Sequence, residues 1–290
     1  MSRRYRFTKM HSCGNDFILF DCRAQSLWDP ETMALILSDR HVGIGGDGMV
    51  MLCPPASDAA DASLRFFDAD GTELPLSVNG LRCAVKLAVD HALTDKTDLV
   101  LEAAGSRIHA SFLPDTVSRG GKNADVRVDM GAPEITSLGA AAVLGGTDRV
   151  VNAVQIGGRC CVLFGEENKL TDPSGNDFDI DRFDLEGFAA SCAGDPLLAD
   201  NARLCVVRTL NKTTLAIRSI DGHGETRADA GSACAAVAAA CRRGVCPRGT
   251  DVTVRLRGGE MTVRYEDDAD GGHIRLTGPA CTVFDGELLF

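Results

Sequence analysis

The feature that most constrains the fold is a pattern that occurs once in each half of the 290-residue chain. In each half, short strand-like runs accompany a segment of four small or polar residues that leads into an apolar helix. The segments are 77–80 (Ser-Val-Asn-Gly), before a helix predicted over 81–93, and 229–232 (Asp-Ala-Gly-Ser), before one predicted over 233–243. This internal duplication predicts two similar domains.

The start of a helix is a natural place to bind an anion. Its first N–H groups have no partner within the helix, and the positive end of the helix dipole lies there. The alternative is that small residues merely let the two helices pack closely against their neighbours. Because the segment occurs in both halves, we favour a binding site for a small anion such as a carboxylate.

A glycine-rich stretch at 43–48 (GIGGDG) matches the pattern G-x-G-x-x-G. A dinucleotide site needs a strand before the glycines and a helix after them. Here a helix is predicted before them (Asp29 and Pro30 to about Ser38) and a strand after them (49–53). The stretch is therefore not predicted to bind a dinucleotide.

Charge and composition exclude several classes of protein. The formal net charge is −11, and no basic stripe is present, which argues against nucleic-acid binding. No apolar run approaches the roughly 18 to 20 residues that span a bilayer, and no secretory signal is recognisable. The twelve cysteines contain no C-x-x-C pair, and the six histidines lack zinc-ligand spacing. We expect a cytoplasmic protein without a metal, whose cysteines are mostly small buried apolar residues.

Eight segments resemble the diaminopimelate epimerase family, and the resemblance covers nearly the whole chain. They are KMHSCGNDF (9–17), RHVGIGGDG (40–48), FFDADGTE (66–73), NGLRC (79–83), VRVDMGAPEI (126–135), GHGET (222–226), ACAAVA (233–238) and LTGPA (276–280).

The resemblance implies an α/β (α+β) fold of two pseudo-symmetric domains. Each domain would be a mostly antiparallel, barrel-like sheet around a central helix, with the active site in the cleft between the domains. The N-terminal domain would comprise 1–125 and the returning strand 281–290, and the C-terminal domain would comprise 126–280. The family uses neither pyridoxal nor metal, so no cofactor is expected, and its members commonly form homodimers.

Both catalytic cysteines of the family are missing. In the family, one cysteine removes a proton from the substrate α-carbon and the other delivers one to the opposite face. The resemblance aligns these positions with Ser77 and Asp229. A carboxylate can accept a proton at neutral pH, whereas a serine hydroxyl needs a neighbouring base. We therefore predict single-base catalysis by Asp229, with Ser77 as a hydrogen-bonding partner. The alternatives are a helix N-cap for Asp229 and a polar turn residue for Ser77.

The predicted substrate contacts have changed as well. The resemblance places Asp68 where the family has an asparagine, and Asp221 where it has a carboxylate-binding arginine. These exchanges favour a cationic group over a second carboxylate, so diaminopimelate is not the expected substrate. Arg159 is a candidate replacement clamp, and Cys160 is a candidate accessory thiol. The predicted substrate-binding residues are Asn15, Asp68, Val78, Asn79, Arg159, Asn201, Asp221, Ala230, Gly231 and Ser232.

The sequence thus predicts a cofactor-independent, epimerase-like isomerase. It would transfer a proton at a carbon next to the carboxylate of a small amino acid. A lyase or dehydratase on the same scaffold is one alternative. A catalytically silent relative that binds a small molecule is the other.

Overall fold

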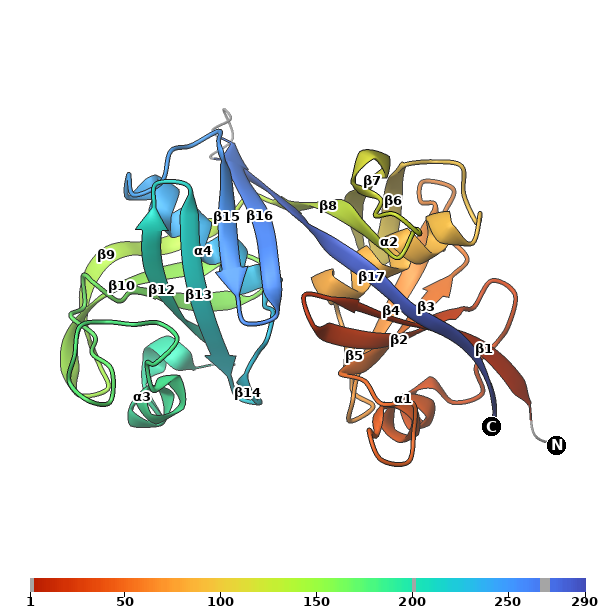
Figure 1. Ribbon diagram of the computed structural model, residues 1–290, viewed down its shortest axis with the longest axis horizontal. Helices are drawn as coiled ribbons and strands as arrows, with labels where there is room; N and C mark the ends of the chain where they lie inside the picture. Colours follow the sequence, from red (N-terminus) through yellow and green to blue (C-terminus); the bar gives the residue numbers. More distant parts are fainter. Residues whose placement is uncertain (1–2, 200–201, 267–271) are drawn as a thin grey trace. The chain divides into compact units, whose positions relative to one another are not determined.

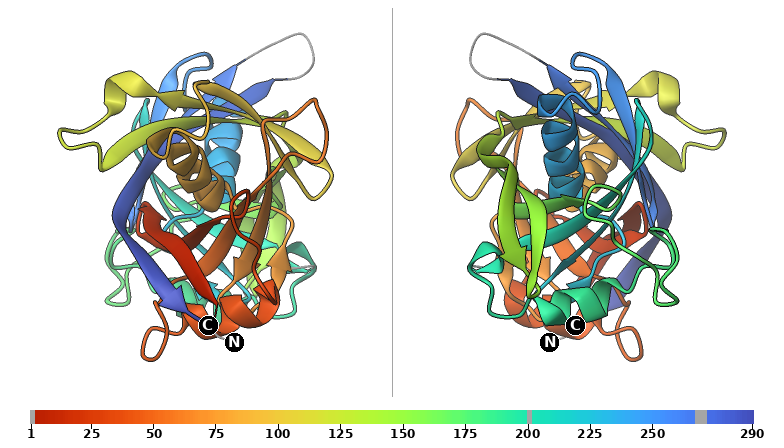
Figure 2. Two further views of the ribbon diagram at one scale, coloured as in Figure 1. Left: turned by 90° about the vertical axis from the view of Figure 1, so that its right-hand side faces the viewer. Right: turned by 90° about the vertical axis from the view of Figure 1, so that its left-hand side faces the viewer.

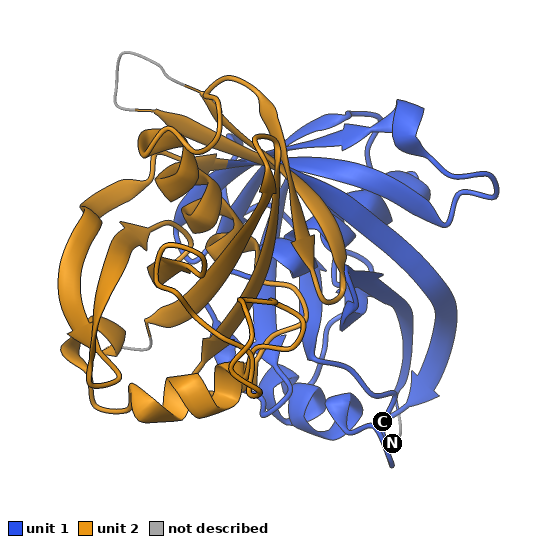
Figure 3. Ribbon diagram, turned by 60° about the vertical axis from the view of Figure 1, so that its left-hand side comes forward, with its two compact units in different colours: residues 1–129, 277–290 blue, residues 130–276 orange. Residues whose placement is uncertain are grey.

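The computed structural model describes residues 3–199, 202–266 and 272–290, and the chain forms two compact units. Unit 1 comprises Met1–Asp129 and Thr277–Phe290, and unit 2 comprises Met130–Leu276 (Figures 1 and 3). These limits lie close to the boundaries predicted at 125/126 and 280/281. Both units consist mainly of strands with few helices, which is the α+β class predicted from the sequence.

The strands of unit 1 form a closed circuit of pairings, as in a barrel. In order around it, they are β1 (Arg4–Ser12), β2 (Asn15–Asp21), β3 (Gly48–Cys53), β4 (Ala62–Asp68), β6 (Asp98–Ala103), β7 (Ser106–Leu113), β8 (Asn123–Gly131) and β17 (His273–Leu289), which pairs with β1 again. The short β5 (Glu73–Leu74) pairs with β4.

The strands of unit 2 pair in a similar series. They are β9 (Glu134–Leu144), β10 (Thr147–Gln155), β11 (Arg159–Phe164), β12 (Arg203–Asn211), β13 (Thr214–Asp221), β15 (Asp251–Leu256) and β16 (Gly259–Glu266). The short β14 (Gly224–Glu225) pairs with β13.

The two units repeat one topology, as the duplicated sequence pattern predicts. From β1 to β7 the pairings are antiparallel, parallel, antiparallel, parallel and antiparallel, and the series from β10 to β16 is the same. Parallel neighbours need a crossover connection. Helices α1 (Pro30–Ser38) and α3 (Leu185–Ser191) lie in the first crossover of each unit. Helices α2 (Val78–Asp90) and α4 (Ala230–Arg242) lie in the second.

Helices α2 and α4 are the central helices of their units. Residues 78–88 of α2 and 230–241 of α4 are all buried. Figure 2 shows α2 among the strands of unit 1 in its left view and α4 among those of unit 2 in its right view. Two short 3-10 helices complete the described structure, Pro114–Thr116 and Pro196–Leu198. No helix in the described part of the chain combines the length and apolar character needed to cross a membrane.

Helices cover both faces of the unit 1 sheet, which explains its uninterrupted apolar runs. Phe20, Met49 and Phe67 pack in one cluster with residues of α1 on the outer face. Val50 and Phe66, from the alternate positions of their strands, contact α2 on the inner face at Gly80. Alternating side chains are thus buried on both sides, as in 17–20 and 48–52.

The sequence predictions for four elements need correction. Both central helices begin three residues earlier than predicted, at Val78 and Ala230, because the residues before them act as N-caps. Strand β9 was missed because its alanines and glycine give no alternation of large apolar residues. Helix α3 was also missed, since its seven residues are too few to show a helical period.

The close contact at Gly80 generates a stability prediction. A Cβ atom at this position would lie 2.9 Å from Val50 Cγ2 and 3.2 Å from Phe66 Cδ1. Alanine favours helix over glycine by about 1 kcal/mol, but overpacking a core costs about 1–3 kcal/mol. We expect Gly80→Ala to lower the free energy of unfolding by about 1 kcal/mol, measured in urea. In a double-mutant cycle, Val50→Ala should reduce that loss. A more stable Gly80→Ala variant would contradict the packing shown here.

Candidate active site

Asp229 is the N-cap of α4, with extended backbone angles (φ −116°, ψ 106°). Its carboxylate is 9% exposed. Oδ1 accepts hydrogen bonds from the backbone N–H groups of Gly231 (2.9 Å) and Ser232 (3.2 Å). The Ser232 hydroxyl donates to Oδ2 over 2.6 Å. The alternative interpretation of Asp229 as an N-cap is therefore confirmed, and its carboxylate is held in one orientation.

An arginine that the sequence analysis missed completes this arrangement. Arg203 Nη1 lies 2.9 Å from Asp229 Oδ1, and Nη2 donates to the Gly157 carbonyl over 2.6 Å. The guanidinium also lies against Gly231, where a Cβ atom would come within 2.6 Å of Nη1. Glycine at 231 therefore lets the arginine approach the start of the helix. The sequence feature that could have pointed to Arg203 is its position two residues after Asn201, which was predicted to bind the substrate.

The two oxygens of Asp229 have different surroundings. Oδ1 accepts three N–H donors, whereas the donor to Oδ2 among the described residues is the Ser232 hydroxyl. A carboxylate oxygen can accept more than one hydrogen bond, so Oδ2 keeps acceptor capacity for a proton. The N–H groups of Gly231 and Ser232, which were predicted to bind a substrate anion, are already bound to Asp229.

A series of buried hydroxyl and thiol groups in unit 2 begins at Asp229. Cys160 Sγ lies 3.6 Å from Ser232 Oγ, and either group can be the donor. A hydrogen bond with Cys160, together with burial, raises the pKa of the Cys205 thiol well above its ordinary value. Cys160 is 3% exposed, and Cys205 and Ser232 are fully buried. The sequence-predicted Cys160 is thus one hydroxyl away from Asp229.

Ser77 caps α2 as Asp229 caps α4. Its backbone is extended, and its Oγ accepts a hydrogen bond from the Gly80 N–H over 3.2 Å. Ser77 is half-buried, and Val78 and Asn79 behind it are buried within the first helical turn. Ser77, for which a polar turn residue was the alternative interpretation, is therefore a helix N-cap.

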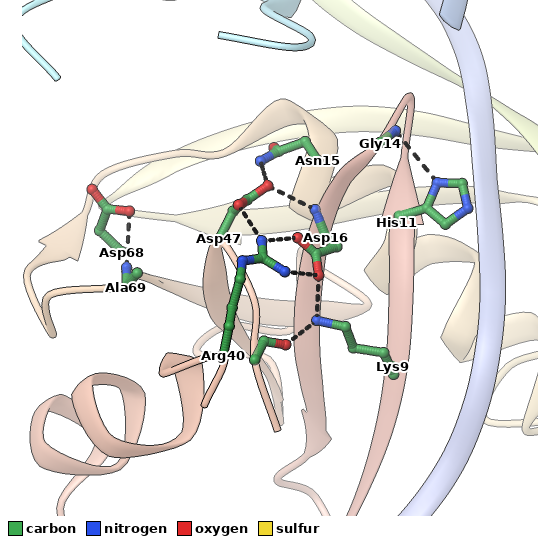
Figure 4. A network of polar contacts seen from close by, with 10 residues as sticks. Lys9, His11, Gly14, Asn15, Asp16, Arg40, Asp47, Asp68 and Ala69 are labelled. Atoms are coloured by element: carbon green, nitrogen blue, oxygen red, sulfur yellow. Dashed lines mark hydrogen bonds and ion pairs between the residues drawn. The ribbon is translucent and has the colours of Figure 1, made fainter. Parts of the chain in front are cut away.

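Asn15 and Asn79 belong to one polar network in unit 1. Asn79 Nδ2 donates to Asn15 Oδ1 (3.1 Å), and Asn15 Nδ2 donates to Asp47 Oδ2 (2.7 Å), as drawn in part in Figure 4. The buried Arg82 donates to Asn79 Oδ1 over 2.6 Å. Both asparagines are thereby fixed near the start of α2. Asp47, in the glycine-rich stretch, thus belongs to this polar network.

A cluster of charges supports Asp47 from the side of β1 and β2. Asp16 pairs with Lys9 (2.6 Å) and with Arg40 (2.6 Å), and Arg40 also reaches Asp47 Oδ1 (2.7 Å; Figure 4). Burial alone would raise the pKa of Asp16. Hydrogen bonds from Arg40 and Lys9, with their charges, outweigh it and lower that pKa to about 2.

The structure places Asp68, Asp221 and Arg159 at the ends of three different strands. Asp68 ends β4 opposite Gly48 and accepts from the Ala69 N–H (2.9 Å), and Figure 4 draws no contact between it and the Asp47 network. Asp221 ends β13 and accepts from the His223 N–H (2.8 Å). Among the described residues, no lysine or arginine forms an ion pair with either carboxylate.

Arg159 and Asn201 complete the predicted set. Arg159 is exposed at the start of β11. Side-chain alternation places it on the face opposite Cys160, so Arg203 and not Arg159 is the arginine at the start of α4. Asn201 lies outside the described residues. Within the described ranges, no three His, Cys, Asp or Glu side chains form a group suited to hold a metal ion.

Known proteins resemble this chain over nearly its whole length. The family model for diaminopimelate epimerase matches residues 7–136. The diaminopimelate epimerases of Acetivibrio thermocellus and Bacillus subtilis are each 33% identical to the chain. The first comparison covers 98% of both chains, and the second covers 97% of this chain and 98% of the relative.

Solved structures share the fold at low sequence identity. A PhzF-family phenazine biosynthesis protein of Bacillus anthracis has a TM-score of 0.73 at 14% identity, covering 99% of this chain and all of that one. A hydroxyproline epimerase of Agrobacterium vitis, solved with trans-4-hydroxy-L-proline, has a TM-score of 0.70 at 15% identity, covering 99% and 93%.

The charge cluster predicts a pH-dependent stability. Because the pKa of Asp16 is lowered on folding, its contribution is present above the unfolded pKa near 4 and is lost as the pH falls toward 2. We expect Asp16→Asn to lower the free energy of unfolding at pH 7 by on the order of 2 kcal/mol. The difference from the unsubstituted protein should shrink between pH 4 and pH 2 in urea titrations. The matched control is Asp58→Asn at an exposed turn. If the loss of unfolding free energy in Asp16→Asn did not change with pH, the ion pairs assigned to Asp16 would be contradicted.

Proposed function

We propose a function for this chain from one premise: it belongs to the diaminopimelate epimerase family. The relatives named above include epimerases, so an isomerase-type enzyme is the general expectation. We infer that this enzyme transfers a proton at the carbon next to the carboxylate of a small amino acid, and that diaminopimelate is not its substrate.

The observation that carries this proposal is the arrangement of Asp229. Arg203 and two backbone N–H groups hold Oδ1, so Oδ2 is the oxygen that can take a proton without loss of these contacts. A positioned carboxylate of this kind acts as a general base. The Arg203 guanidinium keeps the local charge balanced while the base is ionised.

In the proposed step, Asp229 Oδ2 forms a bond to the substrate α-hydrogen. The electron pair of the broken C–H bond moves onto the substrate, where it is delocalised into the adjacent carboxylate. The proton then returns from Oδ2 to a different carbon, one that a double bond of the substrate conjugates with the carbanion. That double bond shifts, so an isomer is formed and the base is regenerated. We assign Ser77 to a hydrogen bond with the substrate, because a hydroxyl without an adjacent base is a poor proton acceptor.

The proposed substrate carries a cationic group. Asp68 and Asp221 stand where the family has a neutral and a basic residue, and neither carboxylate has an ion-pair partner among the described residues. Their side chains accept hydrogen bonds from the local backbone N–H groups of Ala69 and His223. An ammonium or a basic side chain is the complement of such carboxylates. The proposal includes Asn15 and Asn79 as further contacts. It also includes a cytoplasmic location, a homodimer and catalysis without a cofactor.

A second candidate is a relative that binds a small molecule without converting it. One observation favours it: Asp229 accepts four hydrogen bonds as the N-cap of α4, which is a complete structural role in itself. Such a protein would be stabilised by its ligand but would exchange none of the ligand's carbon-bound hydrogen.

Deuterium exchange tests the proposal. A panel of small amino and hydroxy acids would be incubated with the protein in heavy water and analysed by mass and chirality. We expect deuterium at one carbon-bound position of at least one cationic amino acid. Asp229→Asn, which keeps an acceptor for the helix N-terminus, should reduce exchange at least about 100-fold, whereas Ser77→Ala should only weaken it.

The other outcomes separate the alternatives. Equal losses in the two variants would mean that Ser77 also acts as a base. Loss of water or ammonia from the substrate would identify a lyase. Thermal stabilisation by a panel member without exchange, at every pH tested, would support the silent relative and exclude the proposed enzyme.

The contact between Cys160 and Ser232 makes a separate prediction. If the thiol passes a proton to Asp229 through the hydroxyl, Cys160→Ala should lower the rate of exchange by about tenfold or more. Cys161→Ala is the matched control, because Cys161 is equally buried but packs in the apolar cluster on the opposite face. Unchanged exchange in Cys160→Ala would show that this thiol has only a packing role.

A further inference from the structure

Two cysteines of unit 1 differ from all the others in exposure. The structure describes all twelve cysteines, and ten are buried, whereas Cys22 and Cys53 are half-buried. Both pack on the edge of the outer apolar cluster beside α1. Reagents in solution can therefore reach these two thiols more easily than the rest.

The strand register places the two residues side by side. Strands β2 and β3 are parallel, and the last registered pair is Asp21 with Leu52. The next residues along the two strands are Cys22 and Cys53, and the Cys22 N–H donates to the Leu52 carbonyl over 2.8 Å. Neighbouring strands are about 4.8 Å apart. That spacing lies within the roughly 4.4–6.8 Å between Cα atoms that a disulfide requires.

The two thiols have different surroundings. A hydrogen bond between them raises the pKa of Cys22 and lowers that of Cys53. Arg65 also favours the Cys53 thiolate, whereas burial and the carboxylates of Asp21 and Glu73 oppose it. The thiolate is the nucleophile, so we expect Cys53, the thiol with the lower pKa, to react first.

We propose that Cys22 and Cys53 form a reversible dithiol–disulfide site whose reaction partner is a low-molecular-weight disulfide, such as oxidised glutathione. The site is separate from the proposed active site. Cys22 follows Asn15 by seven residues along β2, which at about 3.3 Å per residue is roughly 23 Å. The conversion of an amino acid by Asp229 uses neither thiol.

The reaction consists of two balanced exchange steps. The Cys53 thiolate attacks one sulfur of the small disulfide, whose S–S bond breaks, and one glutathione thiolate leaves and takes a proton from water. Cys22 then loses its proton to water as its sulfur attacks the Cys53 sulfur of the mixed disulfide, and the second glutathione leaves. The protein dithiol is oxidised by two electrons, and the small disulfide is reduced to two thiols.

Peptide mapping of the folded full-length protein tests the site. The protein would be treated with oxidised glutathione, blocked with an alkylating agent and digested with trypsin without reduction. We expect one main cross-linked product, which joins peptide 10–23 to peptide 41–65 and is released by dithiothreitol. Cys53 is the one cysteine of peptide 41–65, and fragment ions distinguish Cys22 from Cys13 in peptide 10–23.

Single variants test the order of the two steps. Cys22→Ser keeps a hydroxyl that can donate to Cys53, and it should stop at a mixed disulfide of Cys53 with glutathione. Cys53→Ser should react about tenfold more slowly, because only the weakly acidic Cys22 remains. Cys22→Ala, which removes the donor, should slow alkylation of Cys53 at pH 7 relative to Cys22→Ser.

Other results would overturn the proposal. These are the absence of the cross-linked peptide in the unsubstituted protein, separate glutathione adducts on both cysteines, or equal labelling of a buried pair such as Cys241 and Cys246. The mapping needs no variant, so a substitution that fails to fold does not prevent the test. Thermal unfolding of the double variant Cys22→Ser/Cys53→Ser checks that the thiols are not required for the fold.

Discussion

The capping of the two central helices is the interaction on which the rest of the structure depends. Helices α2 and α4 begin inside their units, where an unpaired N–H group would be costly. Ser77 and Asp229 satisfy these groups with side-chain oxygens. The same contacts fix the position of both residues that we propose for the chemistry. Stability and the proposed chemistry therefore depend on the same atoms, and a substitution at either position must be judged on both.

Much of the architecture could be predicted because local patterns and tertiary structure agree. The strand alternation, the Asp29 cap of α1 and the internal duplication were all visible in the sequence. The rest could not be predicted because it depends on partners far away along the chain. Strand β9 is stabilised by pairing with β10, because its own alanine-rich residues show no strand pattern. The early start of α4 depends on a cap that the sequence analysis had considered chiefly as a base.

The candidate site shows the same limit. Motif alignment located Asp229, Ser77 and Cys160, but not the arginine that orients Asp229. Arg203 lies 26 residues before Asp229, on a strand whose register beside Cys160 brings it to the start of α4. Arg159 was the candidate because the resemblance aligns residues 157–160 with a substrate-binding segment of the family. In a strand, however, adjacent residues face opposite sides, so the residue across the ladder was the better choice.

The path of β17 has a consequence for how the protein is made. This strand pairs with β1 and β8 to close the circuit of unit 1, yet all of unit 2 precedes its unit 1 part, which begins at Thr277. During translation, unit 1 therefore waits with an open edge on β1 while unit 2 emerges from the ribosome. An uncovered strand edge is a template for wrong pairing between nascent chains. The segment translated first is thus among the last to be completed.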